Sequence, residues 1–178
     1  MNRMEKVVSQ IKSKLPESLR PLGLSLMFNA QVKLAGTAGV RIEQLDTERA
    51  VVKVANRRRV QNHIGGVHAC AMALAAETAT GVLMGMNVPD DKLPLCKSMR
   101  VDFRKVAQGG LQAVATLDQE QQRKIREEDK GDTRVKVVVT DEAGKEPIQA
   151  EMLWAWVPKT RMGKSVAAAA SAAATAGD

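Results

Sequence analysis

One acidic residue stands alone inside an apolar stretch of the chain. With histidine counted as neutral, Glu77 is the only charged residue between Gly65 and Asn87. Burying an ionised carboxylate without a partner is costly, so Glu77 needs either a partner or a chemical role. General base and nucleophile are the roles that carboxylates take in catalysis. The alternative is a buried carboxylate satisfied by Asn62, by Thr80 or by an arginine across an interface.

Amide, imidazole and thiol groups lie close to this residue in the sequence. Asn62 and His63 precede the apolar stretch, and Cys70 would share a helical face with Glu77. Cys70 is therefore a reactive thiol or, as we favour, a small packed residue. His68 would lie opposite Glu77 on the helix, which favours packing or helix capping. His63 either lines an entrance or takes part in catalysis.

A long helix must carry Glu77. Residues 66–86 are almost all Ala, Met, Leu, Val, Thr and Gly, a composition that predicts a helix buried on every side. Gly65 and Gly66 turn the chain into this helix. Its many small residues let neighbouring backbone approach closely, so we expect a central helix around which other elements pack.

Strand patterns stand on both sides of the predicted helix. Before it, two short segments predict a hairpin, residues 38–45 and 50–55. After it, four segments alternate between apolar and polar residues: 95–106, 111–117, 134–140 and 148–157. In the first of these Met99, Val101 and Phe103 share a face, and in the last Met152, Trp154 and Trp156 do. This alternation predicts an α+β protein with a largely antiparallel sheet.

Three regions follow from these patterns. Residues 1–36 predict a helical arm, interrupted at Pro16 and capped again at Ser18, that packs over the core or a partner subunit. Residues 37–158 form the main domain. Within it, the polar segment 118–132 is a helical or mobile surface excursion. Residues 159–178 are an alanine-rich, low-complexity tail outside the fold.

Composition limits the classes of partner. The net charge is +7, yet aromatic residues make up only 2 % of the chain and no zinc-finger or base-stacking pattern occurs, so we expect no nucleic-acid partner. A basic surface equally attracts a small polyanion such as a coenzyme phosphate. Arg57-Arg58-Arg59 and Arg104-Lys105 are candidates for that contact, with ordinary solvated charge as the alternative.

Cysteine use and hydropathy indicate the compartment. Cys70 and Cys96 lack metal-ligand spacing, so the sequence predicts reduced, packed thiols and no metal site. No apolar run reaches the roughly 18 residues needed to cross a membrane, and the N-terminus lacks the core of a secretion signal. We therefore expect a cytoplasmic protein without a membrane partner.

The order of elements resembles the hotdog fold, in which a curved sheet wraps a central helix. Residues 67–78 resemble the helix-start signature of phenylacetic-acid-degradation type acyl-CoA thioesterases, whose acidic residue falls nine positions after a histidine, as Glu77 does after His68. Asn62 matches the asparagine ahead of that helix. Val101-Asp102-Phe103 and Gly109-Gly110-Leu111 resemble the strand-turn-strand continuation.

The chain also departs from that family. Ala69 and Cys70 replace its paired glycines, and the acid is Glu rather than the more usual Asp. Gly65-Gly66 lies before the histidine instead, which is similar to an uncharacterised hotdog subgroup. The resemblance extends over residues 37–157.

The resemblance implies hydrolysis of an acyl thioester, carried by coenzyme A or an acyl carrier protein, with no cofactor beyond the coenzyme A of the substrate. The backbone N–H groups of Ala69 and Cys70 would be oxyanion donors, and Glu77 a general base or nucleophile. Asn62 would orient the water or the thioester. The implied substrate-binding residues are His63, Gly65, Gly66, His68, Arg104 and Lys105.

The implied site is shared between subunits, so we expect a homodimer or a dimer of dimers. Two alternatives remain. A hotdog hydratase or dehydratase would pair His63 or His68 with Glu77 in one cavity. A non-catalytic acyl-binding module would keep the fold without the chemistry, and the loss of the paired glycines favours it.

Overall fold

Residues 1–159 are described by the structure, a computed structural model of the chain. The predicted tail, residues 159–178, lies outside them apart from Lys159. The helices are α1 (Arg3–Lys14), α2 (Arg20–Gln31), α3 (Lys33–Ala38), α4 (Ala69–Asn87) and α5 (Gln119–Glu127), with short 3-10 turns at Glu17–Leu19 and Arg58–Val60. The strands are β1 (Arg41–Leu45), β2 (Arg49–Val54), β3 (Lys92–Phe103), β4 (Leu111–Thr116), β5 (Gly131–Asp141) and β6 (Ile148–Pro158).

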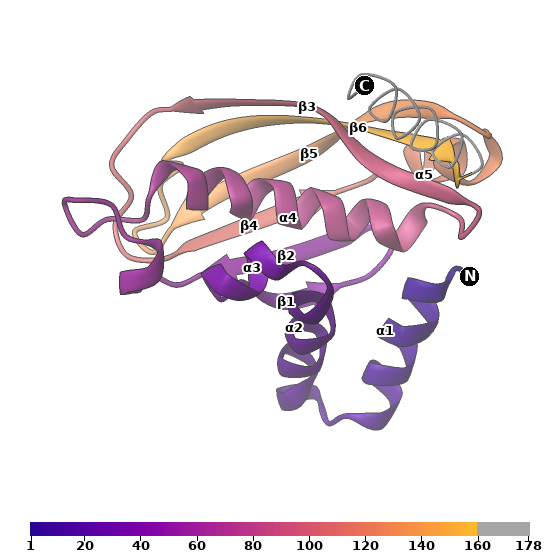
Figure 1. Cartoon of the computed structure of the whole chain (residues 1–178), viewed down its shortest axis with the longest axis horizontal. Helices are drawn as coiled ribbons and strands as arrows, with labels where there is room; N and C mark the ends of the chain where they lie inside the picture. Colours follow the sequence, from indigo (N-terminus) through magenta and orange to yellow (C-terminus); the bar gives the residue numbers. More distant parts are fainter. Residues whose placement is uncertain (160–178) are drawn as a thin grey trace, which may run out of the picture.

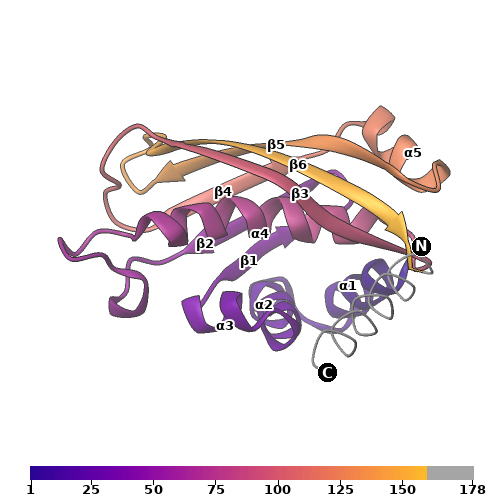
Figure 2. The same cartoon turned by 45° about the horizontal axis from the view of Figure 1, so that its top comes forward.

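All six strands form one antiparallel sheet in the order β1-β2-β4-β5-β6-β3. The sheet curves around α4, which runs along its inner face (Figures 1 and 2). The predicted hairpin is β1 and β2, and the predicted α+β class and central helix are confirmed. The alternation within strands creates this arrangement, because it places one apolar face of the sheet toward the helix.

The central helix begins three residues later than predicted. His68 is its N-cap, with extended backbone angles (φ −63°, ψ 144°). Gly66 lies in the preceding turn, next to Gly65 at φ +78°. Among the described helices, α4 is also the one with the length and hydropathy of a membrane span, and 61 % of that window is buried inside the fold.

The prediction that this helix is buried on every side is wrong. Cys70 is exposed, and Ala73, Glu77 and Gly81 are half-buried, whereas Ala75, Ala76 and Ala79 are fully buried. The described sheet ends at β3, so the stripe with Glu77 and Gly81, which lies next to Trp154 of β6 and near Cys96 of β3, keeps contact with solvent.

Strand β6 contacts the helix through Trp154, and Met152, Trp154 and Trp156 share the buried face as predicted. The indole Nε1 of Trp154 donates a hydrogen bond to Thr80 Oγ1 at 2.9 Å. A Cβ atom at Gly81 would lie 2.9 Å from the Trp154 ring. Glycine at this position therefore lets the indole pack against the helix backbone.

A β-bulge in β3 changes which of its side chains face the helix. The pairing with β6 shifts between Cys96 and Ser98, so that Cys96 lies opposite Trp154 while Met99 lies opposite Met152. Both therefore face inward, although they are three residues apart. The predicted shared face of Met99, Val101 and Phe103 is confirmed by their pairing with residues of one face of β6.

The two edges of the sheet differ. At β1, the backbone N–H of Ile42 donates to Ser25 Oγ at 2.9 Å, and Asn29 Nδ2 donates to the Val40 carbonyl at 2.9 Å. Side chains of α2 therefore occupy hydrogen-bonding groups at this edge. Strand β3 is the opposite edge, and within residues 1–159 its one paired neighbour is β6. Two large inward-facing side chains of β3 stay exposed, Met99 at 49 % and Phe103 at 55 %.

The predicted N-terminal arm is a hairpin of α1 and α2, followed by α3. Figure 1 shows α1 and α2 projecting from the body, with the turn that joins them far from the sheet. A Cβ at Gly23 in α2 would lie 2.7 Å from the Leu15 side chain, so the two helices are closely packed near that turn. Ser18 makes no capping hydrogen bond, because α2 begins at Arg20 with a proline in its first turn. The predicted arm boundary at residue 36 falls within α3.

The base of this hairpin is fastened to the end of the central helix. The buried Asn2 side chain donates from Nδ2 to the carbonyl oxygens of Gly85, Met86 and Val88 at 2.7–3.2 Å. Its Oδ1 accepts from the Glu5 N–H at 2.9 Å and caps α1. One side chain thus satisfies the end of α4 and the start of α1.

We expect Asn2→Ala to destabilise the protein by about 1–3 kcal/mol, because it leaves buried carbonyls and an N–H group without partners. Urea denaturation at equilibrium measures this loss. Gln10→Ala, at an exposed position of α1, is the control and should be near neutral. Equal stability of the two variants would contradict the proposed anchoring.

The polar segment 118–132 contains a helix, α5, with a capping box formed by Asp118 and Gln121. It is more than a surface excursion, because Ile125 is fully buried. Buried Lys92 donates from Nζ to the Glu128 carbonyl at 2.6 Å, just after α5. This contact joins the first residue of β3 to α5, and β3 begins three residues earlier than predicted.

Candidate active site

The loop that leads into α4 is organised by Asn62. Its Oδ1 accepts hydrogen bonds from the backbone N–H groups of Ile64 at 3.1 Å and Gly66 at 3.0 Å. Its own N–H donates to the Gly66 carbonyl at 2.8 Å, and Gly65 adopts the left-handed conformation between them. The side-chain oxygen of Asn62 is thus used by the loop, and Nδ2 is the part of the side chain left for a ligand.

His68 holds the first turn of the helix. Its Nδ1 accepts a hydrogen bond from the Cys70 N–H at 3.1 Å, a side-chain cap of the helix. The capping interpretation of His68 agrees with this contact, and the packing interpretation does not, because His68 is exposed.

The two predicted oxyanion donors therefore differ in whether a hydrogen bond within the chain already occupies them. The Cys70 N–H is already bound by His68. The N–H of Ala69, the first residue of α4, has no hydrogen-bond partner among residues 1–159. A free N–H at the positive end of a 19-residue helix can bind a developing negative charge.

A cavity of ≈ 380 Å³ lies beside this helix start and gathers five of the predicted site residues. They come from the loop, the helix and the segment after β3: Asn62, Gly66, Ala69, Arg104 and Lys105. The cavity also has apolar walls that the sequence analysis did not assign to the site: Met72, Phe103 and Val106. The alternating pattern of β3, which places Phe103 on the same face as Val101, could have pointed to Phe103 as an inward-facing residue. Nothing in the sequence singled out Val106.

A second cavity, of ≈ 280 Å³, lies on the other side of the helix start. His68 and Cys70 line it together with Arg59 and with apolar residues of α3 and α4, including Leu34 and Leu74. The structure thus divides the predicted site residues between two cavities. His63 and Gly65 line neither of them, and both are exposed in the loop.

Glu77 stands apart from both cavities. At 1.5 Å per residue it lies about 12 Å along the helix from Ala69. Burial raises the pKa of the Glu77 carboxyl above its ordinary value. The hydroxyl of Thr78, which is buried and makes no standard hydrogen bond within the described residues, opposes that rise weakly.

The partners proposed for a purely structural Glu77 are engaged elsewhere. Asn62 Oδ1 binds its own loop, and Thr80 Oγ1 donates to backbone carbonyls of α4 and accepts from Trp154. No arginine or lysine of the described chain forms an ion pair with Glu77. The half-buried carboxylate therefore has no structural partner within residues 1–159 that accounts for its position.

The thiols are not packed as the sequence predicted, because both Cys70 and Cys96 are exposed and free. Cys70 is the second residue of α4, beyond the end of the sheet's cover. Cys96 faces inward from the bulged part of β3. Partial burial, and then the nearby Glu77 charge, raise the pKa of the Cys96 thiol. The bulge therefore brings a thiol into the surroundings of Glu77.

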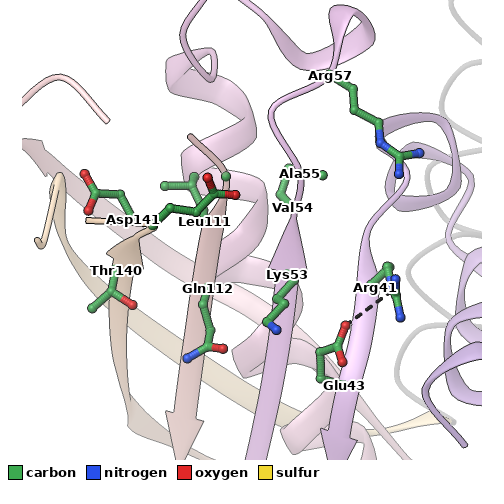
Figure 3. Close-up of a pocket in the computed structure, with 12 residues that line it drawn as sticks. Arg41, Glu43, Lys53, Val54, Ala55, Arg57, Leu111, Gln112, Thr140 and Asp141 are labelled. Atoms are coloured by element: carbon green, nitrogen blue, oxygen red, sulfur yellow. Dashed lines mark ion pairs between the residues drawn. The ribbon is translucent and has the colours of Figure 1, made fainter. Parts of the chain in front are cut away.

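A further cavity, of ≈ 370 Å³, lies on the outer face of the sheet (Figure 3). Arg41, Lys53, Gln112 and Thr140 form a polar row across four strands there. Arg41 Nε pairs with a Glu43 carboxylate oxygen at 3.3 Å. The Asp141 carboxylate accepts three backbone hydrogen bonds, which lower its pKa. The sheet separates this cavity from α4.

Metal chemistry has no ligand set in the described residues. Within residues 1–159, no three His, Cys, Asp or Glu side chains lie close enough together to hold a metal ion.

Comparison with solved structures identifies the architecture. The probable thioesterase PA5026 of Pseudomonas aeruginosa aligns with a TM-score of 0.69 and 24 % identity, over 81 % of this chain and 97 % of its own. A mutant form of the thioesterase PA1618 of the same organism gives 0.62 and 18 % over 75 % and 94 %. The thioesterase HI1161 of Haemophilus influenzae gives 0.63 and 12 % over 78 % and 90 %. The chain has the hotdog fold, as the resemblance implied.

A search of curated proteins gave no match. A family model does match, over residues 22–157, a range that covers most of α2, all of α3 and the central helix, and the sheet except for its last residue. This range includes every residue of the candidate site. The chain belongs to the family described as Domain of unknown function (DUF4442).

Proposed function

We propose that this protein hydrolyses acyl thioesters to a free acid and a thiol. The observation that carries the proposal is the unpaired Ala69 N–H at the start of α4, beside a cavity with apolar walls and a basic rim. A thioester carbonyl accepts hydrogen bonds, its acyl chain is apolar, and its carrier bears phosphates. The thioesterase names of the structural neighbours support the same reaction.

Arg104 and Lys105 are the proposed contacts for the carrier phosphates. Both line the cavity beside Ala69 and are exposed. Their backbone N–H groups donate to the Pro147 carbonyl at 2.8 and 3.1 Å, which fixes the segment after β3. The guanidinium of Arg104 also donates to Gln149 Oε1 at 2.7 Å. Coenzyme A and acyl carrier protein both supply such a phosphate.

The catalytic carboxylate is proposed to come from a second copy of the chain. Glu77 lies about 12 Å along its own helix from Ala69, too far to act on a carbonyl bound there. Strand β3 supplies the surface for pairing, because its outer edge is open and Leu95, Met99 and Phe103 are exposed on it. Two chains joined at β3 would form a continuous sheet with both α4 helices on one face, and each helix start could then meet the partner's carboxylate. A homodimer, or a dimer of such dimers, is the proposed assembly.

Within that site Glu77 would activate water as a general base, or attack the carbonyl itself to form a transient anhydride. The raised pKa suits a base, because a carboxylate of higher basicity removes a proton from water more readily. Asn62 Nδ2 would orient the water or the thioester. The Ala69 N–H would stabilise the oxyanion as the thiolate leaves.

A hydratase or dehydratase is less well supported. It requires an imidazole and a carboxylate facing one cavity, whereas within a chain His68 and Glu77 do not line a common one. His68 Nδ1 is also occupied by the Cys70 N–H. We therefore favour the thioesterase over the hydratase or dehydratase. As a separate proposal, we place the protein in the cytoplasm.

The test is release of free thiol by the purified full chain from a panel of acyl-CoA and acyl-phosphopantetheine substrates. We expect turnover of medium-chain or aryl acyl groups, followed with a thiol-reactive dye. The matched measurement uses the corresponding oxygen esters, which release no thiol and control for dye reaction with Cys70 and Cys96. Absence of turnover across the panel, with acyl-CoA still binding, would instead support the non-catalytic acyl-binding module.

A further inference from the structure

The α1–α2 hairpin carries an apolar surface that residues 1–159 leave uncovered. Leu19, Leu22 and Leu26 are spaced by three and four residues, so they share one face of α2 and its first turn. Their exposed fractions are 45 %, 54 % and 63 %. We call these three residues the leucine stripe.

The same helix buries its opposite face. Leu24 and Ser25 are 1 % and 6 % exposed, and Phe28 packs against the core. Helix α2 is therefore apolar on both sides, although only one side meets the protein. A helix of that composition is normally covered all round. The hairpin also projects from the body (Figure 1), so the leucine stripe lies on a prominent element.

The charge of the hairpin indicates what could cover it. Residues 3–31 contain five basic residues, Arg3, Lys6, Lys12, Lys14 and Arg20, and two acidic ones, Glu5 and Glu17. Glu5 is already bound at the base of α1 by the Asn2 N–H. Three of the five cations, Lys12, Lys14 and Arg20, lie near the turn that joins the helices. A second copy meeting this face would bring two positive surfaces together, which is unfavourable.

We propose that the leucine stripe and the surrounding cations dock the protein on an anionic lipid bilayer. Leucine side chains enter the boundary between headgroups and acyl chains, while lysine and arginine contact the lipid phosphates. The sequence alone argued against a membrane partner, because no apolar run reaches the roughly 18 residues of a membrane span and the N-terminus lacks the core of a secretion signal. The exposed fractions on α2 are what change that expectation.

The hairpin is built to hold the leucine stripe in place. Ile11 and Leu15 of α1 lie against Gly23 of α2, where a Cβ would come within 3.1 and 2.7 Å of their side chains. Arg20 Nε donates to the Leu15 carbonyl at 3.3 Å and closes the turn. A preorganised apolar face loses little conformational entropy when it inserts.

Vesicle binding tests the proposal with the full chain. We expect flotation with vesicles of phosphatidylcholine containing about one third phosphatidylserine, weaker binding to phosphatidylcholine alone, and loss of binding as salt screens the cations. Leu22→Ser with Leu26→Ser should weaken binding about tenfold or more. Lys14→Glu should weaken it by a similar factor while leaving the leucine stripe intact.

Val138→Ser is the matched control, because Val138 is an exposed apolar residue on the outer face of β5, away from the hairpin. It should bind vesicles as the wild type does. Insertion itself is read from Leu22→Trp, since native Trp154 and Trp156 are buried. Its emission should shift to the blue with anionic vesicles and be quenched by brominated acyl chains.

Three results would overturn the proposal. One is an absence of binding to anionic vesicles by the folded wild type, which would leave an acidic protein as the partner to seek. Another is equal binding by the wild type and the double leucine variant. A third is a change of oligomeric state in the leucine variant, measured by light scattering, which would make the leucine stripe a contact between copies. Thiol release is measured separately, so failure here leaves the proposed reaction untouched.

Discussion

Replacing Glu77 by Gln is expected to lower turnover of acyl thioesters at least about 100-fold, the scale of lost acid–base assistance. The amide keeps the shape of the side chain but cannot accept a proton or attack a carbonyl. Because the pKa of Glu77 is raised, the acid limb of the wild-type pH–rate profile should lie above the ordinary glutamate range. Steady-state kinetics between pH 4 and pH 8 measure both effects, within the range in which carboxyl groups of this kind titrate.

The same substitution should make the protein more stable at neutral pH. An unfolded chain releases this proton near the ordinary value of 4.5, whereas the folded chain holds it to higher pH. Between those two values the folded state binds more protons than the unfolded state, so stability falls as pH rises. Glu77→Gln removes that penalty and should therefore raise Tm at pH 7. The difference should vanish below the unfolded pKa.

Glu151→Gln provides the control for both measurements, because Glu151 is exposed on β6 and takes no part in the site. It should leave turnover and Tm close to those of the wild type. Full activity in Glu77→Gln would reject the mechanism. Loss of activity together with loss of stability would indicate that Glu77 holds the fold together instead.

Ala69→Pro is expected to lower kcat by about 10²–10³-fold, the cost of one missing oxyanion donor. Proline lacks the N–H but fits the first position of a helix. The preceding residue, His68, already has the extended backbone that a following proline requires. The helix should therefore persist while the donor is lost. Ala69→Gly keeps the N–H in an equally small residue and should retain most of the activity.

Mixing the two inactive variants tests whether a site is shared between chains. If Ala69 and Glu77 of one site come from different copies, co-expressed Ala69→Pro and Glu77→Gln chains form hybrids with one intact site. Random pairing should then restore about a quarter of the wild-type activity. A mixture that stays inactive, although tags on the two chains show that they have paired, would place the whole site within one chain.

The sequence predicted the layers of the fold well, because period-two alternation and an apolar helix leave few arrangements. It predicted less well which side chains of each element face the interior. Strict alternation backward from Met99 would put Cys96 on the outer face of β3, whereas the bulge at Cys96/Ser98 turns it toward Glu77. A bulge needs one extra residue and has no consistent sequence signature here, so neither the proximity of Cys96 to Glu77 nor the exposure of Cys96 was predicted.

The site was also predicted only in part, because local backbone geometry decides the roles of some of its groups. Asn62, Gly66, Ala69, Arg104 and Lys105 were all named from the sequence, and one cavity gathers them. The roles of backbone groups were harder to assign, because they depend on where the helix begins. With His68 as N-cap, the Cys70 N–H is taken and the Ala69 N–H is free. Their roles in catalysis remain predictions that the variants above address.

The two edges of the sheet differ, and this difference would limit how many chains can associate by strand pairing. Association through β3 would use the open edge of both copies at once, and each outer end of the joined sheet would then be a β1 strand. Ser25 already binds the Ile42 N–H of that strand and Asn29 the carbonyl of Val40 just before it, so a third chain would not find these groups free. In the proposed dimer, helix α2 would therefore oppose the addition of further chains at β1 and the formation of fibres.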